Sequence, residues 1–384
     1  MKARSCYSLH VRLAAHQAIA LCLLLGLTTA ASGQSDVRRP SEIPLAPESA
    51  AEVALSRSPA LKAARARARA EQSDAQADSR PEEPRLSGYY EAGHGDGQSR
   101  VEMTFDLWSL IGAGARRRAA EEAGAEAEAD FAEEALALVE DAKSAVYDVQ
   151  AASATLILRR ERADAARGLK DKAAAGLAGI QAVRAEAALE AARSELSRLL
   201  RAPTNSGWWT EARLPEPPAD VPDAASLLSL AVTRRPSRAA AVAAARAAEQ
   251  RSRAWSSATA GEMRLGLSAE HQPDGRRYGG AAFDVDLPVF NASRPGLEAA
   301  RARADEAAEK ADEEEAALTA ELETLRARLI AARDEEKLWR ESVVPARGDA
   351  DARAAWIEAL RSYWTTRAAL ERAVGGSLPS GESR

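Results

Sequence analysis

The chain has 384 residues, of which 29% are charged and only 4% are aromatic, and its formal net charge is -6. A composition biased toward Ala, Glu, Arg and Leu is typical of long helices and coiled coils. The mild negative charge excludes the basic surface that marks a nucleic-acid-binding protein, and the length suits one elongated domain or two compact ones.

The first 33 residues have the pattern of a secretory signal peptide. A basic stretch with Lys2 and Arg12 precedes an apolar core of ten residues, 18–27, and small residues follow it. We therefore expect cleavage near Gly33. The alternative is that this segment stays attached as an anchor.

Both cysteines, Cys6 and Cys22, lie inside this segment. The exported chain is therefore expected to contain no disulfide, no thiolate metal site and no cysteine nucleophile. After the segment, no stretch of 18 consecutive apolar residues occurs, so no membrane helix is expected. Strands that cross a membrane give a much weaker pattern and stay possible.

The first half of the exported chain begins with a polar segment, 34–48, which is expected to be extended. A helical pattern over 49–78 follows and is broken at Pro59. Two strands, 86–92 and 99–107, then flank a turn rich in Gly and Asp. The second strand alternates apolar and polar residues with a period of two, which is typical of a strand with two different faces.

Long helices are expected next, at 114–172 and 180–200, with a chain reversal at Gly176 and Leu177. A fifty-residue helix is about 75 Å long, which is more than a globular core needs. Small and apolar residues recur in steps of three and four, and this spacing predicts a heptad seam against partner helices. The seam consists of Ala132, Ala135, Val139, Ala142, Val146, Val149, Ser153 and Leu156, and in the second half of Leu318, Leu322, Leu325, Leu329 and Ala332.

A proline-rich linker at 202–222 is expected to separate the first repeat, 49–201, from a second repeat at 223–376. The elements expected in the second repeat are strands at 264–271 and 277–287 and long helices at 296–344 and 353–374, with a reversal at Gly348 and a tail at 377–384.

The repetition is visible in the residues themselves. Each half opens with a similar six-residue segment that ends in proline, 54–59 and 231–236. Each continues with an Ala-rich segment ending in Glu-Gln, two strand-like runs and a long Ala-rich stretch. Because order and spacing agree, we expect two copies of one unit. The expected fold class is mainly α with a small β part, in two repeats of helix, β-hairpin and long helical hairpin.

The strand-like runs have close to the 9–11 residues or so that a tilted strand needs to cross a bilayer. Four strands are too few to close a barrel, and an open hairpin in lipid leaves backbone groups unpaired. If these strands lie in a membrane, several chains must pool them. The alternative is a small soluble sheet.

Short motifs occupy corresponding places in the two halves. They are the openings Ala54–Pro59 and Ala231–Pro236, the strand-to-helix turn Asp286–Phe290 followed by Gly296 and Ala299–Ala302, and the repeat endings Leu199–Pro203 and Leu370–Gly375.

In this order the motifs resemble the outer-membrane efflux proteins of the TolC type, over about residues 50–376. The resemblance implies a homotrimer in which each chain gives four strands to a shared twelve-stranded barrel, while the helices form a periplasmic α-helical barrel. It also implies that the hairpin tips contact a periplasmic adaptor (a membrane fusion protein), itself bound to an inner-membrane pump. Arg201 stands where the family usually has glycine, Trp108 stands where the second copy has Pro288, and both helical hairpins are shorter than usual.

Candidate contact residues lie at the expected reversals. Gly176, Leu177 and Gly348 are candidates for the hairpin tips that an adaptor grips, and plain turn residues are the alternative. Asp349 and Asp351 are candidates for acids at the periplasmic entrance, where charged rings select ions. The alternative is that these acids favour the positive end of a helix that starts there.

Aromatic residues and histidines lie on the expected strands and turns. Tyr89, Tyr90 and Tyr278 could form an aromatic girdle at the membrane interface, or they could be the core of a soluble sheet. His94 and His271 lie in or beside the turns, where three chains could bring imidazoles together around a metal. The simpler interpretation is polar turn residues.

These observations predict a passive channel subunit of a tripartite efflux or type I secretion system, in the outer membrane with a periplasmic extension. The protein is not expected to be an enzyme. It is expected to bind outer-membrane lipid, and no cofactor, metal or nucleic acid is expected. The alternative is a non-conducting periplasmic coiled-coil protein derived from such channels. The substrate, whether metal ion, drug or peptide, stays open, because lumen-facing residues cannot be assigned without the helix register.

The acidic run 312–315 is either lumen charge or a solvated helix face.

Overall fold

The computed structural model describes residues 45–91, 98–168, 172–202, 210–218, 220–258, 262–272, 274–286, 294–342 and 349–378. The expected signal peptide with both cysteines, the turn residue His94 and the reversal residue Gly348 lie outside the described residues. Within these ranges no helix is both long enough and apolar enough to cross a bilayer.

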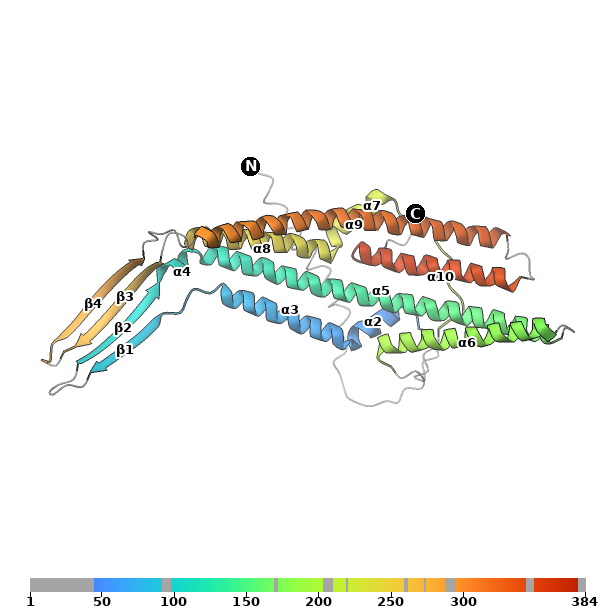
Figure 1. Ribbon diagram of the computed structural model, residues 1–384, viewed down its shortest axis with the longest axis horizontal. Coiled ribbons are helices and arrows are strands. Elements are labelled where there is room, and N and C mark those ends of the chain that lie inside the picture. Colours follow the sequence, from blue (N-terminus) through green and yellow to red (C-terminus); the bar gives the residue numbers. More distant parts are fainter. Residues whose placement is uncertain are drawn as a thin grey trace. The chain divides into compact units, whose positions relative to one another are not determined.

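The fold is mainly helical with one small antiparallel sheet, as the sequence predicts (Figure 1). The elements in chain order are α2 (Pro47–Arg57), α3 (Pro59–Asp78), β1 (Arg85–Glu91), β2 (Gln98–Asp106), α4 (Leu107–Ile111), α5 (Ala113–Arg167), α6 (Lys172–Leu200), α7 (Ala224–Arg234), α8 (Pro236–Ala258), β3 (Glu262–His271), β4 (Arg277–Asp286), α9 (Arg294–Ser342) and α10 (Ala350–Ala373).

The element order runs twice, and the openings of the two copies have the same local geometry. Ser58 ends α2 with φ -63° and ψ 119°, and Arg235 ends α7 with φ -65° and ψ 120°. In each case the next residue, Pro59 or Pro236, begins a new helix. A residue before proline is disfavoured in helical geometry because the proline ring crowds its backbone. The shared proline therefore breaks each opening helix at the same place.

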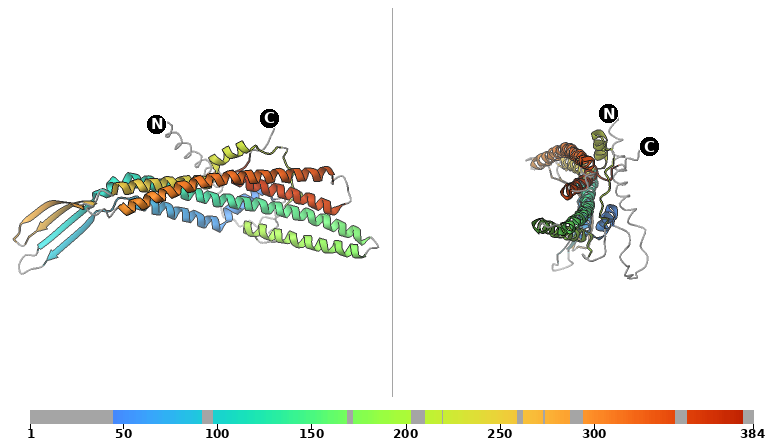
Figure 2. Two further views of the ribbon diagram at one scale, coloured as in Figure 1. Left: turned by 45° about the horizontal axis from the view of Figure 1, so that its top comes forward. Right: turned by 90° about the vertical axis from the view of Figure 1, so that its right-hand side faces the viewer.

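The chain divides into two compact units. Unit 1 comprises residues 1–65, 131–236 and 315–384, and unit 2 comprises residues 66–130 and 237–314. Unit 2 holds the sheet and the helical segments next to it in the chain. In unit 1, the segments of α9, α10, α5 and α6 follow one another along a curved row when viewed along their axes (Figure 2).

The reversal of the first helical hairpin lies earlier than the sequence analysis expected. Helix α6 already begins at Lys172, so Gly176 and Leu177 lie inside a helix and form no turn. A single glycine inside a helix costs only about 1 kcal/mol relative to alanine. Alanines on both sides of Gly176, from Ala173 to Ala178, outweigh that cost.

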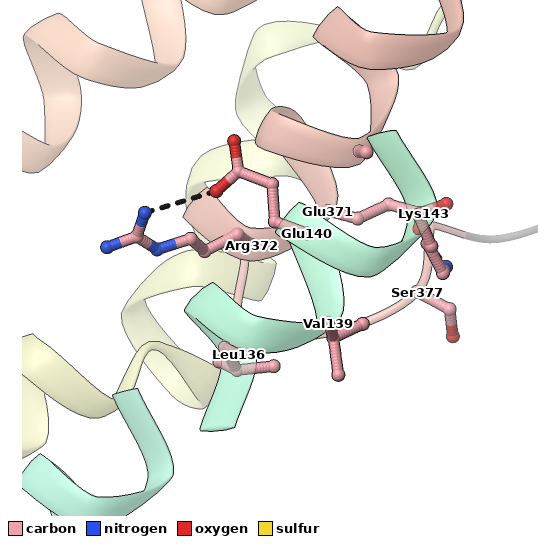
Figure 3. A pocket seen from close by; sticks show the side chains of 9 residues that line it. Leu136, Val139, Glu140, Lys143, Glu371, Arg372 and Ser377 are labelled. Atoms are coloured by element: carbon pink, nitrogen blue, oxygen red, sulfur yellow. Dashed lines mark hydrogen bonds and ion pairs between the residues drawn. The ribbon is translucent and has the colours of Figure 1, made fainter. Parts of the chain in front are cut away.

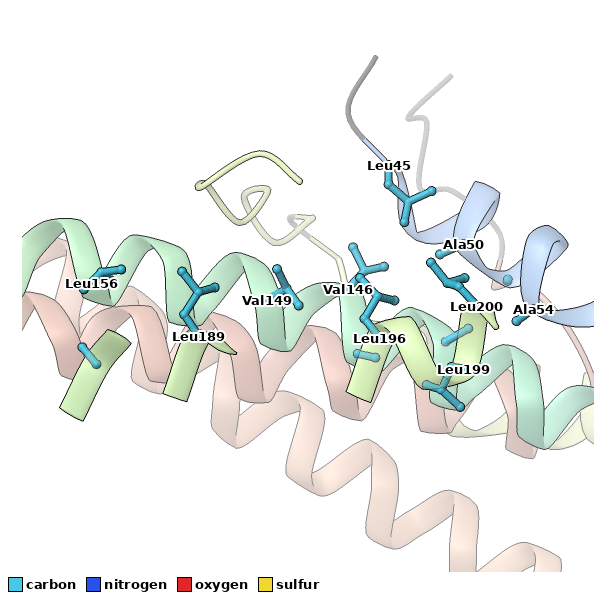
Figure 4. Close-up of a cluster of buried hydrophobic side chains, with 14 residues drawn as sticks. Leu45, Ala50, Ala54, Val146, Val149, Leu156, Leu189, Leu196, Leu199 and Leu200 are labelled. Atoms are coloured by element: carbon cyan, nitrogen blue, oxygen red, sulfur yellow. The ribbon is translucent and has the colours of Figure 1, made fainter. Parts of the chain in front are cut away.

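The predicted heptad seams form the cores of unit 1. In the first core, Val146, Val149 and Leu156 of α5 are buried against the leucines of α6 and the alanines of α2 (Figure 4). In the second core, Leu318, Leu322 and Leu329 of α9 are buried against α7 and α10. The opening helix of each copy thus covers the helical hairpin of the same copy.

The described part of the linker around Leu214 and Pro215 packs against the helices. Leu214 is buried with Tyr147 of α5 and Leu360 of α10. The indole of Trp364 stacks on Tyr147 with ring centroids 5.4 Å apart, and its Nε1 donates to the Pro215 carbonyl at 2.9 Å. Prolines in this segment carry no backbone donor, so side-chain contacts of this kind anchor it.

The junction of α7 and α8 is tied to three other helices of unit 1. The Arg235 guanidinium is 8% exposed and lies 3.2 Å from a Glu133 carboxylate oxygen and 3.7 Å from one of Glu321. It also donates to the Arg372 carbonyl at 2.7 Å. Beside it, a Cβ on Gly375 would lie 2.5 Å from the Arg234 carbonyl oxygen. The backbone of the last turn of α10 therefore approaches α7 at a distance that only glycine allows.

The equivalent helix end of the first copy, at Arg201, has the same left-handed backbone. Arg201 has φ 51°, and Gly375 has φ 79°. Left-handed geometry is costly for residues with a Cβ. At the end of α6, the chain therefore tolerates the backbone strain of a non-glycine residue, Arg201. At Gly375, glycine is favoured both by the left-handed backbone and by the close approach of Arg234.

We expect Gly375→Ala to lower the free energy of unfolding by at least about 2 kcal/mol, since it adds both backbone strain and a clash with Arg234. Thermal unfolding of the purified full chain, followed by circular dichroism, measures the change. The matched control is Arg201→Ala, which keeps a Cβ at a left-handed position and should leave the midpoint nearly unchanged. Equal effects of the two substitutions would contradict the close approach.

Candidate functional site

The four strands form one sheet in the order β1-β2-β3-β4, with every neighbour antiparallel. The second hairpin continues the first because β2 pairs with β3, so that Val101 lies opposite Ala269 and Phe105 opposite Leu265. The two copies of the repeat therefore meet in a single sheet. Strands β1 and β4 are its edges.

One face of this sheet is apolar. Successive residues of a strand point to opposite faces, and the register places the apolar residues of all four strands on the same side. Only Ser99, His271 and Arg277, close to the turns, interrupt this face. Its apolar members are Leu86, Tyr90, Val101, Met103, Phe105, Met263, Leu265, Leu267, Ala269, Ala281, Phe283 and Val285.

The opposite face is polar and carries charges of both signs. Its side chains contact one another: Arg100 Nη2 lies 3.3 Å from Glu102 Oε2, and Tyr89 donates its hydroxyl to Glu91 at 2.6 Å. The members are Arg85, Ser87, Tyr89, Glu91, Gln98, Arg100, Glu102, Thr104, Asp106, Arg264, Gly266, Ser268, Glu270, Tyr278, Gly280, Ala282 and Asp284.

The apolar face is open in the described part of the chain. Leu86 is 69% exposed, Tyr90 71% and Phe283 61%. A contiguous apolar patch of this kind marks a surface that meets a partner or a membrane. Among the described strands, β1 and β4 are the edges of the sheet, and edge strands offer backbone donors and acceptors to a further strand.

The strand register separates the three tyrosines that were expected to form one girdle. Tyr90 lies on the apolar face, whereas Tyr89 and Tyr278 lie on the polar face. The three tyrosines therefore do not share one face of the sheet, and a girdle at the membrane interface stays a prediction. The alternation of side chains in a strand was enough to separate Tyr89 from Tyr90, and the sequence analysis did not use it.

In unit 1, ion pairs follow the seam between α5 and α10. Pairs near the start of α10, such as Glu161–Arg353, are exposed, and exposed pairs contribute little each. The pair of Lys143 and Glu371 is the most buried, with side chains 13% and 15% exposed. The pairs are Glu133–Arg372 (3.1 Å), Glu140–Arg372 (3.1 Å), Lys143–Glu371 (2.6 Å), Asp148–Arg361 (2.8 Å), Glu161–Arg353 (3.9 Å) and Asp351 with Arg159 and Arg162.

A small recess lies in this seam, near the end of α10 (Figure 3). Leu136, Val139 and Glu140 of α5 line one side, and Glu371 and Arg372 line the other. The Arg372–Glu140 pair crosses it, so the polar groups are already occupied by each other. The recess is part of the helix contact and offers no free charge to a ligand.

The two acids expected at the periplasmic entrance have partners inside the chain. Asp349 caps α10 and accepts hydrogen bonds from the backbone of Asp351 and Ala352. Asp351 accepts from the guanidinium groups of Arg159 and Arg162 on α5, and these two hydrogen bonds hold the pKa of its carboxyl below the usual range. The partners of Asp351 lie about half the chain away, and the sequence analysis did not anticipate them.

The residues expected at the tip of the first hairpin lie on an exposed apolar stripe of α6. Leu177 is 64% exposed, Ile180 52% and Val183 67%. A spacing of three residues places them on one side of the helix. The spacing alone could have predicted this stripe. The sequence analysis missed it because it expected a turn at Gly176 and a helix only from residue 180.

The structure brings no metal-binding cluster together among the residues it describes: no group of three or more His, Cys, Asp or Glu has suitable geometry. His271 lies on the apolar face beside the second hairpin turn, with a buried Nδ1 that has no hydrogen-bond partner in the described chain. Its expected partner, His94, lies outside the described residues.

No protein-family model and no curated protein matches the chain. Solved structures do match it. The outer-membrane channel OprN aligns with a TM-score of 0.66 at 17% identity, over 86% of this chain and 90% of that chain. The CmeC outer membrane channel of Campylobacter jejuni aligns with a TM-score of 0.65 at 13% identity, over 93% and 95% of the two chains.

The open state of the MtrE outer membrane channel of Neisseria gonorrhoeae aligns with a TM-score of 0.61 at 16% identity, over 91% of this chain and 96% of that chain. At such identities the likeness concerns the fold. The chain therefore has the fold of these outer-membrane channels, and the TolC-type resemblance predicted from its motifs is confirmed at that level.

We expect Asp351→Asn to lower the thermal midpoint at pH 7, because it removes the negative charge and one of the two oxygen acceptors that Arg159 and Arg162 use. Since the folded-state pKa of Asp351 lies below its unfolded value, this stabilisation is complete above the ordinary carboxyl range and is lost as the pH falls through the folded-state pKa. The difference between the variant and the parent chain should therefore shrink as the pH falls below the ordinary carboxyl range. Thermal unfolding between pH 7 and pH 3 measures it.

Asp349→Asn is the matched control, because asparagine caps a helix about as well as aspartate. Its midpoint should stay close to that of the parent chain at every pH. A loss at pH 7 that is as large for Asp349→Asn as for Asp351→Asn would contradict a specific role of the arginine pair.

Proposed function

We propose that the chain is one subunit of a homotrimeric outer-membrane channel, through which solutes leave the periplasm as part of a tripartite efflux or type I secretion system. The observation that carries the proposal is the sheet with one apolar face, one polar face and two open edges. Such a sheet suits a wall between lipid and water, because lipid-facing and lumen-facing residues alternate along membrane strands.

The open edges specify how the wall is completed. Backbone groups in a bilayer must all be paired, so membrane sheets close into barrels. Pairing β4 of one copy with β1 of the next closes a ring without new strands. Three copies give twelve strands, and the fold shared with outer-membrane channels supports this number. The apolar face then meets outer-membrane lipid, and the polar face lines the lumen.

The helices continue the conduit into the periplasm. The curved row of α9, α10, α5 and α6 in unit 1 is the shape of one sector of a tube wall (Figure 2). The channel performs no bond chemistry, and energy for export comes from an inner-membrane pump. Opening separates the helix ends, and the pairs of Asp351 with Arg159 and Arg162 resist that separation by holding α10 against α5.

The hairpin ends are the proposed contact for a periplasmic adaptor. The exposed stripe of Leu177, Ile180 and Val183 begins one helical turn from the start of α6, beside Gly176. On the second hairpin, the corresponding contact is proposed at Gly348. Asp349 and Asp351 would lie near the entrance as capped and ion-paired acids, so their charges are partly compensated within each chain.

Two neighbouring alanines of β4 test which face meets lipid. Ala281 lies on the apolar face opposite Leu267, and Ala282 lies on the polar face opposite Gly266. We expect Ala281→Arg to destabilise the membrane-inserted protein by about 2–4 kcal/mol. Ala282→Arg, the matched control, should change it by less than about 0.5 kcal/mol. Urea unfolding of the protein in lipid vesicles measures both, and equal effects would contradict a lipid-facing side.

The assembly is tested by the mass of the mature protein, extracted from isolated outer membranes and measured by light scattering with the detergent contribution subtracted. We expect a trimer, and we expect this trimer to conduct ions in a planar bilayer. A monomer, or a protein found only in the soluble periplasmic fraction, would rule out the channel and favour a non-conducting coiled-coil protein.

A further inference from the structure

One row of the polar face differs in the size of its side chains from the two rows that follow it toward the helices. The strand register places Tyr89 of β1 opposite Arg100 of β2, Arg100 opposite Glu270 of β3, and Glu270 opposite Tyr278 of β4. All four residues have long side chains. We call these four residues the Tyr-Arg row.

The two rows next to the Tyr-Arg row, on the side of the helices, are built mostly from smaller residues. The next row contains Ser87, Glu102, Ser268 and Gly280, and the row after it contains Arg85, Thr104, Gly266 and Ala282. Each of these rows has one long side chain among three short ones. The side chains of the Tyr-Arg row therefore extend farther from the sheet than most side chains of these two rows.

The Tyr-Arg row lies near the hairpin turns, at the end of the sheet away from the long helices. Tyr89 is two residues from the end of β1, whereas Asp106 at the other end of β2 leads directly into α4. In an outer-membrane barrel with its helices in the periplasm, the turns face the exterior. The Tyr-Arg row then lies just inside the outer mouth.

Hydrogen bonds and ion pairs hold three of the four side chains on the polar face. The Tyr89 hydroxyl donates to Glu91 Oε2 at 2.6 Å, and Arg100 Nη2 lies 3.3 Å from Glu102 Oε2. Glu270 Oε1 accepts from the side-chain amides of Gln98 at 2.8 Å and Gln272 at 3.2 Å. The tyrosine rings stand in the open, with Tyr89 54% and Tyr278 48% exposed.

Resting on the channel proposed above, we propose that Tyr89, Arg100, Glu270 and Tyr278 form the outer constriction of the pore and set the size of the solute that can leave. Threefold repetition of the Tyr-Arg row surrounds the lumen near the outer mouth with long side chains, which are staggered along the pore axis because the strands are tilted. With strands about 4.8 Å apart and tilted by about 40°, a twelve-stranded barrel is roughly 24 Å wide between backbones. Long side chains from opposite walls fill much of that width.

The charges of the Tyr-Arg row balance, so the constriction is expected to select solutes by size more than by the sign of their charge. Each chain contributes one cation, Arg100, and one anion, Glu270, so the three rows together have no net charge. Ion selectivity by a charged ring needs an excess of one sign. Removing the phenol rings should therefore change the largest solute admitted and leave the ratio of potassium to chloride permeability unchanged.

The test is polymer exclusion in planar bilayers containing the purified full-length trimer. Poly(ethylene glycol) of graded mass is added only to the side of the hairpin turns, so that the outer mouth alone is probed. For the double variant Tyr89→Ala/Tyr278→Ala we expect the exclusion limit to shift to larger polymers. The ratio of potassium to chloride permeability in potassium chloride gradients should not move.

Tyr90→Ala is the matched control, because Tyr90 is the next residue but lies on the apolar face. It should leave the exclusion limit unchanged. Tyr89→Phe keeps the ring and removes only the bond to Glu91, and it should also leave the limit unchanged. If the double variant does not assemble, each single alanine variant is measured, and each should shift the limit in the same direction.

An unchanged limit in assembled alanine variants would overturn the constriction, and a shift caused equally by Tyr90→Ala would do the same. Failure of the parent protein to conduct at all is a different result, because it would overturn the channel itself. The two proposals are thus separated by one set of recordings.

Discussion

The sheet of this chain exposes an apolar face and two edge strands, and this exposure is the constraint that shapes the rest of the architecture. Its apolar face carries residues such as Leu86 and Phe283 that stay open, and the edges β1 and β4 keep unpaired backbone groups. A soluble sheet would be expected to cover such a face with helices, but here the long helices continue away in the chain. The proposed lipid contact and the proposed oligomer both rest on this one constraint, since a membrane would cover the apolar face and further copies would close the edges.

The long helices of unit 1 pack side by side through thin apolar cores. Small residues in the α5 seam let neighbours approach closely, and the leucines of α6, α9 and α10 fill the space between them. The polar margins of the same seam are joined by ion pairs such as Lys143–Glu371. Apolar packing stabilises the hairpins, while the partly exposed pairs near the helix ends, such as Asp351 with its two arginines, contribute less.

The two copies of the repeat are alike in architecture and differ in detail. Both use a proline to separate the opening helix from the next one, and both bury the opening helix against their own hairpin. Only the second copy has a glycine at the left-handed end of its last helix, because its backbone there touches the α7 end at Arg234. Arg201 shows that left-handed geometry alone does not require glycine in this chain.

The sequence by itself determined the features that depend on local periodicity: the two repeats, the long helices, the seam through Val146 and Leu322, and the strands with alternating residues. These are readable because helix and strand periods are properties of neighbouring residues. The start of α6 also follows from local propensity, since the alanines around Gly176 favour helix, although the sequence analysis expected a turn there. Tertiary structure decided that four particular side chains share one row and that Asp351 meets Arg159, because pairing register and contacts across half the chain depend on how separate elements are brought together.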